Sequence, residues 1–143
     1  MQAWMLLWLM LLTTPQTSVA EDLGALSANP FDSDSMANPF GKGSPFALTG
    51  VNHPFSSYGS PFSNTSASIL FATDAPKLYD QQGNYRGKLS TNPFEADSTS
   101  NPVGRYGAPF SQDSVKNPFG AGSPFRSDSP NSPYGKGWRI EGR

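Results

Sequence analysis

The chain contains no cysteine and a single histidine, His53, and its 143 residues carry a formal net charge of −1 at pH 7. Without cysteine there can be no disulfide, no thiolate nucleophile and no zinc site built on sulfur. One histidine in a proline-rich turn offers no acid–His–Ser arrangement. The near-zero net charge provides no electrostatic attraction for nucleic acid or for an anionic membrane. The sequence therefore predicts a protein that is not an enzyme and that holds no cofactor and no metal.

Long apolar runs are also absent. The one sustained run, residues 3–12, has ten residues, whereas a permanent transmembrane helix needs about 18 or more. The segment that follows ends in Ser18-Val19-Ala20, and small residues at these positions suit cleavage after Ala20. We therefore expect residues 1–20 to be a cleavable signal peptide. The mature chain would then be secreted or periplasmic, with no membrane anchor.

Large apolar side chains are scarce beyond this segment. Leu, Ile, Val and Phe make up about 17% of residues 21–143, below the roughly 20% that usually accompanies disorder. Pro, Gly and Ser together make up over a third of the same residues, and proline and glycine both oppose helix. We therefore expect a mostly irregular Pro/Gly/aromatic fold with little helix, and this composition leaves partial disorder open.

The aromatic residues follow an internal repeat. Proline directly precedes Phe31, Phe40, Phe46, Phe55, Phe62, Phe94, Phe110, Phe119 and Phe125, and also Val103 and Tyr134. Phe71 keeps the spacing without a proline. Steps of nine residues alternate with steps of six or seven, which gives a compound period of 15–16 residues. We expect these aromatic side chains to pack on one another and on the prolines.

The two kinds of step differ in composition. The short steps contain glycine, as in residues 41–43 and 120–122, and indicate tight turns. The long steps carry an acidic residue followed by serine: Asp34-Ser35, Asp97-Ser98, Asp113-Ser114 and Asp128-Ser129, with Thr65-Ser66 in the same place. Such side chains can accept hydrogen bonds from backbone amides two or three residues later. His53 stands where Asn or Ser usually precedes the proline, and we interpret it as a variant of that position.

A stretch of different composition interrupts the repeat. The chain divides into a signal peptide (1–20), an N-terminal repeat block (21–71), a central stretch (72–91), a C-terminal repeat block (92–138) and a tail (139–143). Large side chains alternate on each side of Gly83 within residues 77–89, which predicts a β-hairpin with Gly83 in its turn. This hairpin is the only regular secondary structure that we predict. If the chain folds only on a partner, the unpaired edges of the hairpin would be the place for that partner.

The central stretch resembles a group of small exported bacterial proteins. The residues that carry the resemblance are Ala-Pro-Lys-Leu-Tyr-Asp at 75–80, Gly-Asn-Tyr-Arg-Gly-Lys-Leu-Ser at 83–90 and Asn-Pro-Phe at 92–94. Proteins of this group carry Asn-Pro-Tyr-Gly and Gly-Ser-Pro-Tyr repeats on each side of such a hairpin. The resemblance covers roughly residues 29–138, with Phe in most positions where Tyr is commoner. Because the group has no assigned activity, the resemblance implies a bacterial envelope location and no mechanism.

Two alternative functions stay open on the residues. Asp32-Ser33-Asp34-Ser35 places hard oxygen ligands at alternating positions, which suits a calcium-dependent module or small enzyme, although no complete EF-type loop is present. Asn-Pro-Phe tripeptides occur at 29–31, 38–40, 92–94 and 117–119. They match the short ligand of EH domains, and several copies would raise affinity.

We favour a third interpretation, a non-enzymatic repeat protein that serves as a structural or binding element of the bacterial envelope. Ser, His and Ala also precede Pro-Phe, at Ser44, His53 and Ala108, which a linear recognition motif would not tolerate. The partner would be an envelope protein or a polysaccharide, because the many aromatic rings would suit stacking on sugar or peptide faces.

Overall fold

The fold is built around a small antiparallel β-sheet. The computed structural model describes residues 21–142, and its strands are β1 (Glu21–Leu26), β2 (Lys77–Tyr79), β3 (Tyr85–Lys88) and β4 (Trp138–Gly142). Their order in the sheet is β1-β4-β2-β3. No helix occurs among the described residues, so the prediction of little helix is confirmed, and none of the described segments is a helix that could cross a membrane. The predicted signal peptide lies outside the described residues.

The predicted hairpin is present. β2 and β3 pair with Tyr79 opposite Tyr85. The Gly83 N–H donates a hydrogen bond of 3.0 Å to the Asp80 carbonyl oxygen, and Gly83 has a φ of +85°. Glycine adopts this conformation without steric cost, which is why the sequence places it between the two strands.

The expectation that this hairpin is the only regular secondary structure is wrong. β1 and β4 come from opposite ends of the described chain and pair with Leu26 opposite Trp138. β4 also pairs with β2, with Ile140 opposite Leu78, and it occupies most of the segment that the sequence assigns to a tail. Trp138 and Ile140 are buried while Arg139 between them is exposed. This alternation is typical of a strand with one face on a core.

The hydrophobic core lies on one face of the sheet. Leu78, Trp138 and Ile140 are at most 2% exposed. The cluster of buried residues consists of Leu23, Val51, Tyr58, Ala67, Leu78, Ala121, Trp138 and Ile140. It contains no phenylalanine, although Phe is the most abundant large apolar residue in the repeat. The core therefore depends on the strands and on a few aliphatic, alanine and tyrosine side chains from the loops.

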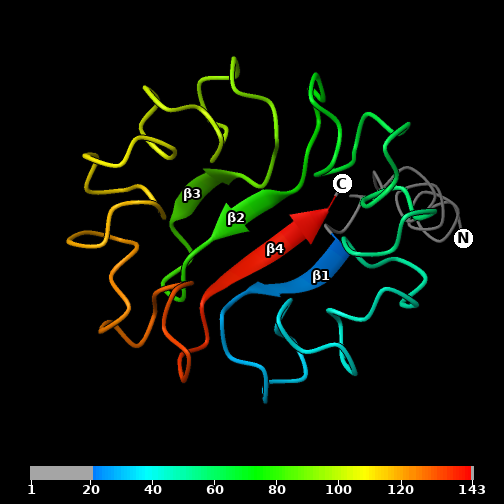
Figure 1. Cartoon of the computed structure of the whole chain (residues 1–143), viewed down its shortest axis with the longest axis horizontal. Helices are drawn as coiled ribbons and strands as arrows, with labels where there is room; N and C mark the ends of the chain where they lie inside the picture. The colour runs from blue at the N-terminus through cyan, green and yellow to red at the C-terminus, as the bar shows by residue number, and fades with distance from the viewer. Residues whose placement is uncertain (1–20, 143) are drawn as a thin grey trace, which may run out of the picture.

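Two long turn-rich segments surround the sheet. We call residues 27–76 the first arm and residues 89–137 the second arm. Figure 1 shows the first arm (cyan to green) on one side of the sheet and the second arm (yellow to orange) on the other. The first arm runs from β1 to β2 and the second from β3 to β4. β2 and β4 are the two central strands of the sheet, and they pair with each other. Each arm therefore leads back to the middle of the sheet, where the two halves of the chain meet.

The two halves carry an internal duplication. Residues 24–31 read Gly-Ala-Leu-Ser-Ala-Asn-Pro-Phe, and residues 87–94 read Gly-Lys-Leu-Ser-Thr-Asn-Pro-Phe, 63 positions later. The N–H of the second residue in each motif, Ala25 or Lys88, donates to the carbonyl oxygen nine residues later, at 2.7 and 2.8 Å. β1 pairs with β4 as β3 pairs with β2. The sheet therefore has an approximate two-fold symmetry that relates β4 to β2.

These equivalent contacts also cover the outer edges of the sheet. Ala25 in β1 forms a parallel bridge to Ser35, and Lys88 in β3 forms one to Ser98. On its other side the hairpin pairs with β4. The expectation that the hairpin has unpaired edges is therefore wrong, and little free backbone is left there for the addition of a partner strand.

Candidate functional site

Six of the Pro-aromatic positions form β-turns that are closed by two hydrogen bonds, and the others have one of the two. In Asn-Pro-Phe-Gly at residues 38–41, the Gly41 N–H donates to the Asn38 carbonyl oxygen at 3.3 Å. The Phe40 N–H donates to the Asn38 side-chain Oδ1 at 2.9 Å. Proline suits the second position of such a turn, because its φ is already set and it has no N–H to satisfy. Each turn is thus held by contacts within four residues.

The same side-chain cap recurs along both arms. The side chains that accept the N–H of the residue two positions later are Asn29, Asn38, Ser44, His53, Ser60, Asn92, Asn101, Asn117 and Ser123, at 2.9 to 3.3 Å. His53 accepts through Nδ1, 3.0 Å from the Phe55 nitrogen, so it acts as the positional variant that the sequence indicated. Asn, Ser and His exchange here because each reaches the amide with an acceptor atom. Two residues that precede the proline of such a turn do not form this cap: Ala108, whose side chain has no acceptor, and Ser132, for which no such hydrogen bond is present.

The side chains that follow these prolines are exposed to solvent. The eleven side chains that follow these prolines, together with Phe71, are called the rim residues. They are Phe31, Phe40, Phe46, Phe55, Phe62, Phe71, Phe94, Val103, Phe110, Phe119, Phe125 and Tyr134. Their exposed fractions run from 67% for Phe71 to 95% for Phe40. The prediction that these aromatic side chains pack on one another in the interior is wrong. They occupy the third position of their turns, at the outer corner of the arm, while the first position makes the inward hydrogen bonds.

Small polar residues take the interior positions instead. Buried serines, each at most 1% exposed, are Ser35, Ser66, Ser98, Ser114 and Ser129. The hydroxyl oxygen of each accepts the N–H of the residue two positions later, at 3.0 to 3.1 Å. Ser35 Oγ also donates to the Ser27 carbonyl, as Ser98 Oγ does to the Ser90 carbonyl. The predicted amide capping by the Asp-Ser pairs is therefore carried out by their serines, whose small size lets the loops close.

Aspartates of the Asp-Ser pairs make ion pairs. Asp113 lies 2.7 Å from Arg105 Nε and 2.9 Å from Arg86 Nη1, and Arg86 Nη2 lies 2.9 Å from Asp80. The hydrogen bond from Arg105 is the main cause that lowers the pKa of Asp113. Burial opposes ionisation of Asp80, but hydrogen bonds from Asn84 and Arg86 outweigh it and lower the pKa of this carboxyl. These charges tie the hairpin to the second arm.

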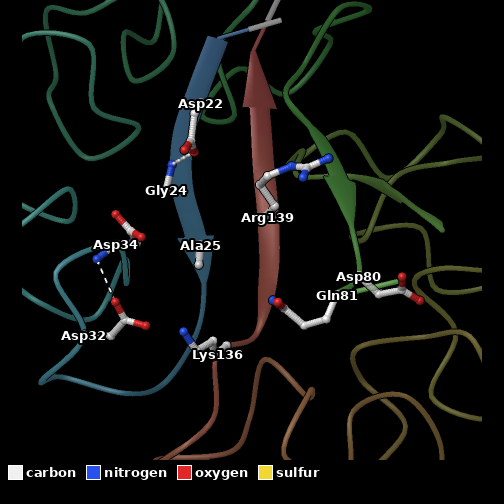
Figure 2. Close-up of a pocket in the computed structure, with 9 residues that line it drawn as sticks. All are labelled: Asp22, Gly24, Ala25, Asp32, Asp34, Asp80, Gln81, Lys136 and Arg139. Carbon is white, nitrogen blue, oxygen red and sulfur yellow. Dashed lines mark hydrogen bonds between the residues drawn. The ribbon is translucent and has the colours of Figure 1, made fainter. Parts of the chain in front are cut away.

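A polar cavity of about 220 Å³ lies beside β1, β4 and the hairpin turn (Figure 2). It is lined by Asp22, Gly24, Ala25, Asp32, Asp34, Asp80, Gln81, Lys136 and Arg139. Two of its carboxylates accept backbone N–H groups: Asp22 from Gly24 at 2.9 Å and Asp32 from Asp34 at 3.0 Å. Asp80 is held by the hairpin turn and its arginine, as described above. The lining carboxylates therefore hold neighbouring loops in place.

The candidate calcium ligands Asp32 and Asp34 are both engaged within the protein. Asp32 caps the turn that contains Asp34, and the Asp34 carboxylate lies 3.6 Å from Lys42 Nζ. Within residues 21–142 there is no group of three or more His, Cys, Asp or Glu side chains that could hold a metal ion. The geometry of the described chain gives the calcium alternative no support.

Sequence reasoning identified the rim positions but missed that they face solvent. A signal was available, because these positions accept Phe, Tyr and, at Val103, the much smaller valine. A close-packed core does not tolerate such a change of volume without cost, whereas an exposed corner does.

Comparison of the chain with protein-family models, with curated proteins and with solved structures found no match.

Proposed function

We propose that this protein is an exported, non-enzymatic element of the bacterial envelope that acts by binding, with the rim residues as its contact surface. The observation that carries the proposal is the exposure of these side chains, from 67% to 95%. Soluble monomers rarely expose large contiguous apolar patches, and such patches mark interaction sites. The core around Trp138 and Ile140 forms without any of the rim residues, so they are free to serve another purpose.

The turns that present the rim residues are ordered before any partner binds. Most of these turns have a backbone hydrogen bond, most have the side-chain cap, and proline restricts the backbone of most of them. An aromatic side chain adds only two rotatable bonds. Binding through a pre-ordered aromatic surface therefore has a small entropic cost.

The polar atoms beside the rim residues are already used within the turns. Asn38 accepts the Phe40 N–H through Oδ1 and donates to the Asp32 carbonyl through Nδ2, and Asn117 is engaged in the same way. Few hydrogen-bonding groups are left there for the hydroxyls of a sugar. Between the two partners considered, this favours an apolar protein surface over a polysaccharide.

The expected cleavage site lies just before the first described strand. Cleavage after Ala20 would release a chain that starts at Glu21, the first residue of β1, which lies opposite Gly142 in β4. Removal of residues 1–20 would therefore leave every described strand pairing in place.

The test is expression of the full chain in a bacterial host, followed by fractionation. A triple variant, Phe40→Ser with Phe119→Ser and Phe125→Ser, removes three rim residues that are 91–95% exposed. Wild type and variant should both be exported and have the mass of a chain that begins at Glu21. Only the wild type should be retained with the envelope fraction. Equal retention of the variant would contradict the contact surface, and a chain that still begins at Met1 would contradict export.

A second candidate is a multivalent Asn-Pro-Phe ligand of EH domains. It is favoured by the observation that all four tripeptides form Asn-capped turns with an exposed phenylalanine. The variant Asn38→Ser with Asn117→Ser separates the two candidates, because serine caps equivalent turns at Ser44 and Ser123. Because Asn-Pro-Phe remains at 29–31 and 92–94, binding that this variant weakens would select the EH ligand. Binding that only the triple phenylalanine variant abolishes would select the apolar surface.

A further inference from the structure

The rim residues occur as two matched sets of six. Each member of the first arm has an equivalent 63 or 64 positions later in the second arm. The pairs are Phe31 and Phe94, Phe40 and Val103, Phe46 and Phe110, Phe55 and Phe119, Phe62 and Phe125, and Phe71 and Tyr134. The duplication that gives the sheet its approximate two-fold symmetry therefore also duplicates the contact surface, one set on each arm.

One contact within the chain shows that members of the two sets pack on each other. Phe71 of the first set and Phe94 of the second set stack with ring centroids 6.4 Å apart and an interplanar angle of 6°. This lies in the range in which aromatic pairs attract beyond simple burial. Phe71 and Phe94 are 67% and 77% exposed, against 90% or more for Phe40, Phe62 and Phe125.

We infer that the protein the rim residues bind is a second copy of this chain, joined rim to rim by aromatic stacking of the kind seen between Phe71 and Phe94. This inference rests on the proposed function, in which the rim residues are the contact surface. The net charge of −1 at pH 7 means that two copies do not repel one another over long range, and near-zero charge promotes association. The rim itself consists of uncharged side chains.

The available area suits a weak, concentration-dependent contact. An aromatic side chain buries on the order of 150 Å², so three or four neighbouring rim residues on one arm supply about 500 Å² on each partner. The adjacent prolines add to this. A standard stable interface buries about 800 Å² on each partner, and transient ones bury less.

The two sets make this association open-ended. A copy that uses the set on its first arm keeps the set on its second arm free for another copy. A chain that carries two contact surfaces can bind one further copy at each of them. Such assembly continues unless the geometry closes a ring. The chain would then build extended assemblies, which is what a structural element of the envelope requires.

Sedimentation velocity of the purified exported chain over a range of concentrations tests the inference without any partner. The average mass of the wild type should rise with concentration beyond that of a dimer. Substitution of one set, Phe40→Ser with Phe55→Ser and Phe62→Ser, should stop growth at the dimer. Addition of Phe110→Ser, Phe119→Ser and Phe125→Ser in the other set should leave a monomer. Leu48→Ser is the matched control, because Leu48 is 85% exposed but is not a rim residue, and it should assemble as the wild type does.

Several results would overturn the inference. A wild type that stays monomeric at every concentration would refute the second copy as partner, and retention in the envelope fraction would then show that the proposed function itself survives. If the average mass of the wild type levels off at that of a dimer, the role of two sets is refuted. The same holds if the variant with all six substitutions assembles as the wild type does. A thermal melt confirms that each variant is folded. Added salt should strengthen the assembly, since apolar contacts are not screened whereas ionic ones are; weakening by salt would also count against it.

Discussion

Gly83 and Gly87 have almost the same φ angle in very different surroundings. Their φ angles are +85° and +92°, so an alanine at either position must adopt a left-handed backbone that costs about 1–2 kcal/mol. A Cβ atom at Gly83 would meet nothing within 4 Å. A Cβ atom at Gly87 would lie 2.6 Å from the Asp97 carbonyl oxygen and 2.8 Å from two side-chain atoms of Tyr106.

We therefore expect Gly83→Ala to lower the free energy of unfolding by about 1–2 kcal/mol, the backbone cost alone. Gly87→Ala should lower it by about 3–5 kcal/mol, because the first loop of the second arm must also move away from β3. Gly24→Ala should behave like Gly87→Ala, since Gly24 has a φ of +105° and its Cβ would lie 2.5 Å from the Asp34 carbonyl oxygen.

Urea unfolding followed by circular dichroism measures these differences directly. If Gly83→Ala and Gly87→Ala cost the same, the close approach of the second arm to β3 does not exist. If Gly24→Ala and Gly87→Ala differ by more than about 1 kcal/mol, a difference well outside the usual experimental error, the two sheet edges are not equivalent and the duplication argument fails.

Three further predictions follow from the burial and charge of individual residues. Phe119→Ala should change the unfolding free energy by less than about 0.5 kcal/mol, because the side chain is 91% exposed. Ile140→Ala should lower it by about 2–5 kcal/mol, because Ile140 is buried. Thermal melts compare the two variants, and a large loss of stability in Phe119→Ala would mean that the rim is packed. Ser98→Ala should cost about 1–3 kcal/mol, because the Ser100 N–H loses its acceptor in a buried site; an unchanged urea midpoint would show that water replaces the hydroxyl. Asp80 and Asp113 have lowered pKa values in the folded state, so the stability they contribute is present above about pH 4 and is lost as the pH falls through their folded pKa values. Urea midpoints measured from neutral to acid pH should fall in wild type and fall less in Asp80→Asn, and equal pH dependence would contradict the role of this ion pair.

The sequence by itself determined the local turns and the absence of helix from residues 21–142. In Asn-Pro-Phe-Gly, the acceptor at the first position, the preset φ of proline and the small residue at the end all favour the same turn, and every contact lies within four residues. The hairpin between Lys77 and Leu89 was predictable for the same reason, because Gly83 and the alternating large side chains beside it are local features. The duplication is also present in the sequence itself, in residues 24–31 and 87–94.

Only the tertiary structure decided which residues are inside. A turn has the same hydrogen bonds whether its outer corner meets solvent or a neighbouring arm, so nothing local distinguishes an exposed Phe119 from a buried one. β1 and β4 depend on pairing between Leu26 and Trp138, which lie at opposite ends of the described chain, and β1 has a glycine at its centre and no β-branched residue. Its strand conformation comes from its partner, not from its own propensity. Once both arms close on the central sheet, the small serines fit inside the loops, and the phenylalanines are left at the outer corners.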